Sequence, residues 1–150
     1  MLPRGRRLGV DVGKVRVGVA LSDPDGILAS PLVTVPRDMG AAADSVPADI
    51  AELVRLVREH EAVQVVVGLP VRLDGSEGTA AIDIRAYAER LARAVGHVPV
   101  LLADERMSTV VASRRLAERG VRGKRQRAVV DQAAAVEILQ SWLDAQRRQT

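Results

Sequence analysis

Residues 8–22, LGVDVGKVRVGVALS, combine two patterns that predict an antiparallel hairpin. Leu8 to Val12 form a short and mostly apolar run. The second run alternates apolar residues with small or polar ones, at Val15, Val17, Val19 and Leu21. A period of two residues is typical of a strand with one buried face. Gly13 and Lys14 lie between the runs and predict a tight turn, so Asp11 is expected inside the first strand.

The segments that follow extend the hairpin into a larger sheet. Asp23-Pro24-Asp25-Gly26 is a turn signal, and Ile27 to Val35 predict a third strand. Apolar runs predict further strands at Ala62–Val67 and Val98–Ala103. Helical spacing and end signals predict helices at Ser45–His60, between Gly78 and Gly96, at Ser108–Arg119 and from Val130 onward.

This order of elements predicts an α/β fold. Buried strands that alternate with helices pair in parallel, whereas the first three strands form an antiparallel meander. We therefore expect one five-stranded mixed sheet with helices on both faces. No internal repeat divides the sequence, so residues 1–150 are expected to form a single domain.

Composition excludes several classes of protein. The 150 residues contain no Cys, which excludes disulfide scaffolds, thiolate zinc sites and Cys nucleophiles. No apolar run approaches the roughly 18 residues of a membrane span. Asp11 interrupts the stretch that a signal peptide would require, so we expect a cytoplasmic protein without a membrane partner. One Trp and one Tyr offer few rings on which single-stranded bases could stack.

The positive charge is concentrated in one segment. Residues 114–127 contain seven basic residues and one acidic residue, whereas the whole chain has a net charge of only +3. Such a cluster indicates a polyanion partner, usually nucleic acid, and the alternative is a solvated helix face and loop. We expect nucleic-acid contacts from Lys14, Arg16, Arg106, Arg114, Arg115, Arg122, Lys124, Arg125 and Arg127.

Asp11, Glu105 and Asp131 are candidate metal ligands. Burying a carboxylate inside a strand is costly, so Asp11 is either paired or faces a site. Glu105 follows the fifth strand, at the edge where open α/β sheets bind ligands. Asp131 shares the apolar face of the last helix and is aimed toward the sheet. Such an oxygen-only set selects Mg²⁺ or Mn²⁺, and two such ions can support phosphodiester hydrolysis.

Each carboxylate also has a structural explanation. Asp11 can begin the hairpin turn, and Asp131 can cap the start of the last helix. Glu105 can interact with a helix dipole and with Arg106. Neighbouring residues of a strand point in opposite directions, and the sequence leaves open whether Asp104 joins or replaces Glu105.

Four motifs occur in order along nearly the whole chain. They are Val10-Asp11-Val12-Gly13 with Gly18-Val19-Ala20, Val67-Gly68-Leu69-Pro70 with Asp74-Gly75-Ser76-Glu77-Gly78, Asp104-Glu105-Arg106 with Ser108-Thr109, and Asp131 with Ala134-Ala135 and Ile138-Leu139-Gln140. With them the chain resembles the YqgF/RuvX family of RNase H-like nucleases. That family commonly has Lys where this chain has Val15, between Lys14 and Arg16.

The resemblance implies an RNase H-like fold and metal-dependent cleavage of nucleic acid by Asp11, Glu105 and Asp131. It also implies maturation of the 5′ end of the 16S ribosomal RNA precursor in the bacterial cytoplasm. A second activity implied for the family is resolution of Holliday junctions, which are four-way DNA junctions. Both substrates are structured and largely duplex, which agrees with the scarcity of aromatic residues.

Two further classes compete with a nuclease. A non-catalytic RNA-binding factor for ribosome assembly could keep the same fold, although retention of all three carboxylates argues against it. A sugar kinase or actin-like ATPase would need two related domains, and 150 residues supply one. The sequence does not fix the oligomeric state, but a junction resolvase would act as a dimer because two symmetric strands must be cut.

Overall fold

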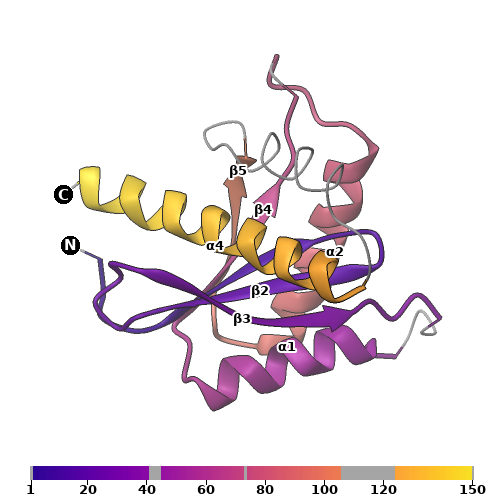
Figure 1. Ribbon diagram of the computed structural model, residues 1–150, viewed down its shortest axis with the longest axis horizontal. Helices are drawn as coiled ribbons and strands as arrows, with labels where there is room; N and C mark the ends of the chain where they lie inside the picture. The colour runs from indigo at the N-terminus through magenta and orange to yellow at the C-terminus, as the bar shows by residue number, and fades with distance from the viewer. Residues whose placement is uncertain (1, 41–44, 73, 106–123, 150) are drawn as a thin grey trace.

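The computed structural model describes residues 2–40, 45–72, 74–105 and 124–149, and for residues 124–128 it describes the backbone only. Within these ranges the chain forms one sheet with helices packed against it (Figure 1). The elements are β1 (Arg7–Val12), β2 (Arg16–Ser22), β3 (Ala29–Pro36), α1 (Ala48–Glu59), β4 (Gln64–Leu69), α2 (Thr79–Val95), β5 (Val100–Asp104) and α4 (Lys124–Arg148).

The sheet has five strands in the order β3-β2-β1-β4-β5. β1, β2 and β3 pair antiparallel, while β1 pairs with β4 and β4 with β5 in parallel. This arrangement confirms the predicted mixed sheet. The β1–β2 turn is closed by the Gly13 N–H, which donates to the Arg16 carbonyl oxygen at 2.9 Å.

Helices cover both faces of the sheet, as predicted (Figure 1). Side chains alternate along a strand, so Leu8 and Val10 enter the core beneath α1 and α2. Gly9 and Asp11 face the other side, where α4 packs. A Cβ atom on Gly9 would lie 2.6 Å from Leu139 Cβ, so α4 rests directly on β1. None of the described helices is long and apolar enough to cross a membrane.

The start of α4 differs from the prediction. The helix begins at Lys124, six residues before Val130, because the polar residues that precede the apolar stripe are good helix formers. Asp131 therefore lies inside the helix, and the prediction that it could be an N-cap is wrong. The predicted helix at Ser108–Arg119 lies outside the described residues.

The turn between β2 and β3 is organised by Asp23. One carboxylate oxygen, Oδ1, accepts the backbone N–H groups of Ile27 and Leu28 at 2.8 Å each. These bonds stabilise the charged form, and the bond from Leu28 contributes most to lowering the pKa of the Asp23 carboxyl. The turn therefore keeps a fixed shape.

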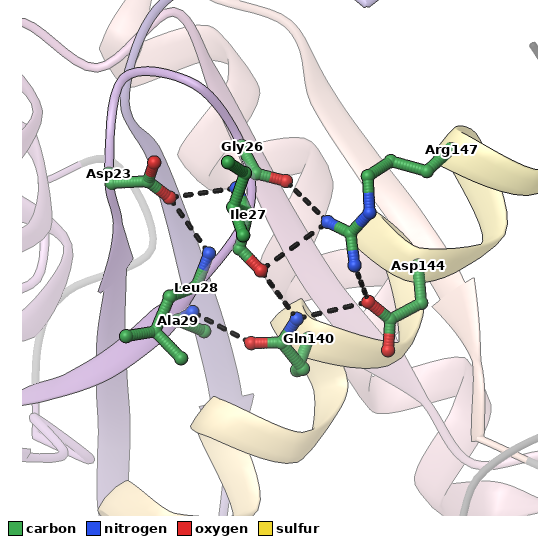
Figure 2. Close-up of polar contacts among 8 residues, drawn as sticks. All are labelled: Asp23, Gly26, Ile27, Leu28, Ala29, Gln140, Asp144 and Arg147. Carbon is green, nitrogen blue, oxygen red and sulfur yellow. Dashed lines mark hydrogen bonds and ion pairs between the residues drawn. The ribbon is translucent and has the colours of Figure 1, made fainter.

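The carboxyl-terminal half of α4 is bonded to this turn (Figure 2). Gln140 accepts the Ala29 N–H and donates to the Ile27 carbonyl oxygen, both at 2.8 Å. Arg147 donates to the Gly26 carbonyl oxygen at 2.7 Å. Hydrogen bonds are directional, so these contacts fix the position of α4 along the sheet.

A buried polar network links the helical layer to the hairpin. The Tyr87 hydroxyl of α2 donates to Asp49 Oδ2 in α1 at 3.0 Å, and the Asp49 side chain is buried. Burial raises the pKa of the Tyr87 hydroxyl well above its usual range, and the nearby Asp49 charge raises it further. The Arg37 guanidinium lies 5.2 Å from the Tyr87 ring centre and donates to the Gly13 carbonyl oxygen at 3.1 Å.

This raised pKa predicts how stability changes in alkali. Because the folded pKa exceeds the unfolded value of about 10, Tyr87 contributes stability that is complete below about pH 10 and is lost as the pH rises further. The free energy of unfolding should therefore fall less steeply above pH 10 in Tyr87→Phe than in the wild type. Denaturant unfolding at several pH values measures both slopes. Tyr87 is the only tyrosine, so tyrosinate absorbance reports its titration directly. Identical slopes would contradict the prediction.

Candidate active site

Asp11 lies near the end of β1 on the face covered by α4, and only 4% of it is exposed. Its partner in β2 is Gly18. On the other side Val10 pairs with Val67, which places Gly68 of β4 next to Asp11. Glycine in a strand interior commonly marks the close approach of another backbone or a ligand. Asp11 is thus flanked on both sides by residues without side chains.

Asp131 lies over one of these glycines. A Cβ atom on Gly18 would be 2.1 Å from the Asp131 carbonyl oxygen, so α4 touches the β2 backbone there. Opposed residues of antiparallel strands lie about 5 Å apart, which brings Asp131 to the neighbourhood of Asp11. The predicted aim of Asp131 toward the sheet is confirmed. Its Oδ2 accepts a hydrogen bond from Arg16 Nε at 2.8 Å.

Glu105 approaches from the other side. It follows β5 and is 4% exposed, and its Oε1 would lie 2.8 Å from a Cβ atom on Gly68. Asp104 is exposed whereas Glu105 is buried, and Glu105 is the one that lies against Gly68. Both acids line a pocket of about 400 Å³ between β5 and α4, to which Ile138 and Trp142 also contribute.

The three predicted carboxylates therefore lie on one face and at one end of the sheet. They do not form a preassembled cluster, because among the described residues no three His, Cys, Asp or Glu side chains are close enough together to hold a metal ion. The oxygen-only donor set suits Mg²⁺ or Mn²⁺. In this conformation the Asp131 carboxylate is bonded to Arg16, so binding a shared ion requires a side-chain rearrangement.

The predicted basic residues are described only in part. Lys14 is exposed in the hairpin turn, and Arg16 contacts Asp131. Four others lie outside the described residues: Arg106, Arg114, Arg115 and Arg122. Three more lie in the first turn of α4, where only the backbone is described: Lys124, Arg125 and Arg127.

Two features of the site were not predicted from the sequence. The first is the pair of glycines beside Asp11, for which the signal was present because Gly18 and Gly68 interrupt apolar strands. The second is the ion pair between Arg16 and Asp131. No local pattern signals this contact, because its partners are separated by 115 residues.

This chain matches one family model and is similar to proteins that share a single name. The family model described as "RuvX: Holliday junction resolvase" matches residues 5–145. A protein of Nocardia farcinica is 57% identical over 141 residues, covering 94% of this chain and 78% of that protein. One of Rhodococcus erythropolis is 55% identical over 145 residues, covering 97% and 81%. Both bear the name "Putative pre-16S rRNA nuclease".

A solved structure shares the architecture. T. thermophilus RuvC in complex with a Holliday junction substrate superposes with a TM-score of 0.57 at 15% identity, covering 95% of this chain and 96% of that one. At this identity the likeness concerns the fold alone. It confirms the predicted RNase H-like α/β fold.

Proposed function

Because this chain belongs to the RuvX family, described as Holliday junction resolvases, we propose that it is a metal-dependent endonuclease acting on structured nucleic acid. The observation that carries the proposal is the placement of Asp11, Glu105 and Asp131 on one face and at one end of the sheet. The names of its relatives support the precursor of 16S ribosomal RNA as the substrate, and we propose that the cut lies at the 5′ end of that RNA. The family description supports a four-way DNA junction as the alternative.

Asp11, Glu105 and Asp131 would hold Mg²⁺ or Mn²⁺. When bound, such ions activate a water molecule and stabilise the leaving oxygen of an in-line displacement. Asp11 is held by the hydrogen bonds of β1 with its neighbours. Asp11 and Glu105 are buried, and the low local dielectric strengthens their attraction for a cation. Asp131 completes the set from α4.

We propose that basic side chains bind the substrate through its phosphates. Lys14 is exposed at the hairpin turn next to β1. Phosphate contacts from arginine are often bidentate. The proposed contacts are Lys14, Arg16, Arg106, Arg114, Arg115, Arg122, Lys124, Arg125 and Arg127. We place this activity in the bacterial cytoplasm and in a single domain over residues 1–150, consistent with the one sheet that the described residues form.

The two candidate substrates can be compared directly. Purified protein is incubated with an RNA that carries the 5′ extension of 16S ribosomal RNA and with a four-way DNA junction, each with Mg²⁺, Mn²⁺ or EDTA. We expect metal-dependent cuts in the RNA and none with EDTA. Cleavage confined to the junction would favour the resolvase activity, and a strictly monomeric protein would argue against it. Tight RNA binding without cleavage under either metal would contradict the nuclease and favour an assembly factor.

A further inference from the structure

Arg16 and Asp131 connect the β1–β2 hairpin to α4 across the candidate active site. Arg16 Nε donates to Asp131 Oδ2 at 2.8 Å. The two side chains are only 27% and 18% exposed. A charged pair that is this well covered is screened by salt less than a surface pair, so it holds the Asp131 carboxylate on the hairpin side.

A metal ion at this site would need the same carboxylate. A guanidinium and a divalent cation repel each other. When both lie at one carboxylate, each is therefore bound more weakly than it would be alone. Arg16 already occupies Asp131 Oδ2, and the described residues gather no three acidic side chains for an ion. The observed ion pair and a metal bound through Asp131 are therefore alternative states.

We propose that Arg16 competes with the divalent cation for Asp131 and so keeps the metal site incomplete until the ion displaces it. This inference rests on the proposed function, because it assumes that Asp131 is a metal ligand. Arg16 is then a positioning residue that acts through Asp131. Its backbone is held by pairing with Pro36 and by the Gly13 N–H, so only the side chain has to move. The displaced guanidinium stays beside the site, where it can bind a substrate phosphate.

Competition and preorganisation predict opposite effects of losing Arg16. If the guanidinium merely steadied Asp131 for the metal, its removal would weaken metal binding. Because the paired arrangement does not gather the acids, we expect competition to dominate. Arg16→Gln should then bind Mn²⁺ about fivefold more tightly, which is the scale of one partly exposed ion pair. Arg16→Lys keeps the charge and should stay nearer to the wild type.

The test measures Mn²⁺ affinity without substrate, from the electron paramagnetic resonance signal of free Mn²⁺. The variants are Arg16→Gln, Arg16→Lys and Asp131→Asn. Arg55→Gln is the matched control, since it removes the same charge from ion pairs with Glu52 and Glu59 on α1. Circular dichroism confirms that each variant is folded. Tighter binding in Arg16→Gln but not in Arg55→Gln supports the proposal.

Two other outcomes would overturn it and can be told apart. If Asp131→Asn weakens Mn²⁺ binding while Arg16→Gln leaves it unchanged or weaker, the competition is wrong and the proposed metal site survives. If Asp131→Asn leaves Mn²⁺ binding unchanged, Asp131 is not a metal ligand. In that case the proposed site fails and the role of Arg16 fails with it.

Discussion

Replacing Asp11 with Asn is expected to lower the rate of phosphodiester cleavage more than about 100-fold, beyond the usual cost of losing a group that only supports a metal ligand. Asn has nearly the same shape but carries no charge, so it attracts a divalent cation far less. The fold should survive, because a buried neutral amide costs less than a buried carboxylate. Single-turnover cleavage with Mg²⁺ or Mn²⁺ measures the loss, and thermal unfolding checks the fold.

Asp83→Asn is a suitable control for this experiment. Asp83 is exposed on α2, and α2 lies on the sheet face opposite α4, so the substitution changes the net charge equally without touching the site. We expect near wild-type cleavage from this variant. If a folded Asp11→Asn protein cleaved as fast as the wild type, the chemistry would have to lie elsewhere in the molecule.

Gly18→Ala is expected to lower both the stability and the rate of cleavage, because it displaces α4. Its new Cβ atom would lie 2.1 Å from the Asp131 carbonyl oxygen, so the helix backbone must move away from β2. Overpacking of this kind costs about 1–3 kcal/mol. A displacement of about 1 Å in a reacting group can lower a rate about 100-fold. The variant should therefore lose both stability and activity, although Gly18 has no side chain of its own.

Thermal unfolding and cleavage are compared with Gly40→Ala. A Cβ atom on Gly40 would meet nothing within 4 Å, so this variant tests the general effect of replacing glycine by alanine. For a protein of this size, each 1 kcal/mol lowers the melting temperature by about 2–4 °C. Equal melting temperatures for Gly18→Ala and Gly40→Ala would show that α4 does not press on β2 as described.

The hairpin, the order of the elements along the chain and the aim of Asp131 could be predicted from local patterns, whereas the order of the strands in the sheet was not predicted. The alternation from Val15 to Leu21 predicted β2, although both faces of that strand are buried: Val17 and Val19 lie in the core beneath α1 and α2, and Gly18 lies against α4. Asp131 was predicted to face the sheet because it shares one side of its helix with apolar residues. This prediction does not depend on where the helix begins. The start of α4 was predicted too late, because the apolar stripe begins after the helix does.

The contacts that complete the site could not be predicted in the same way. Arg16 contacts Asp131 only because the register of β2 and the position of α4 on the sheet bring together residues that are far apart in the sequence. The closeness of Glu105 to Gly68 likewise depends on the parallel pairing of β4 with β5. Periodicity identifies the face on which a residue lies, but it does not identify its partner across the sheet.

The hydrogen bonds between α4 and the β2–β3 turn define a point about which this helix can tilt. Gln140 fixes it nine residues from Asp131, a distance of about 13 Å along the helix axis. A tilt of the helix by about 5° around Gln140 would move Asp131 by about 1 Å. Gly18 blocks motion toward the sheet, whereas the Arg16 contact restrains motion away from it. The helix extends about as far beyond Gln140 as Asp131 lies before it, so small changes at the far end of α4 reach the carboxylate at nearly their full size. Substitutions remote from the site can therefore alter its geometry.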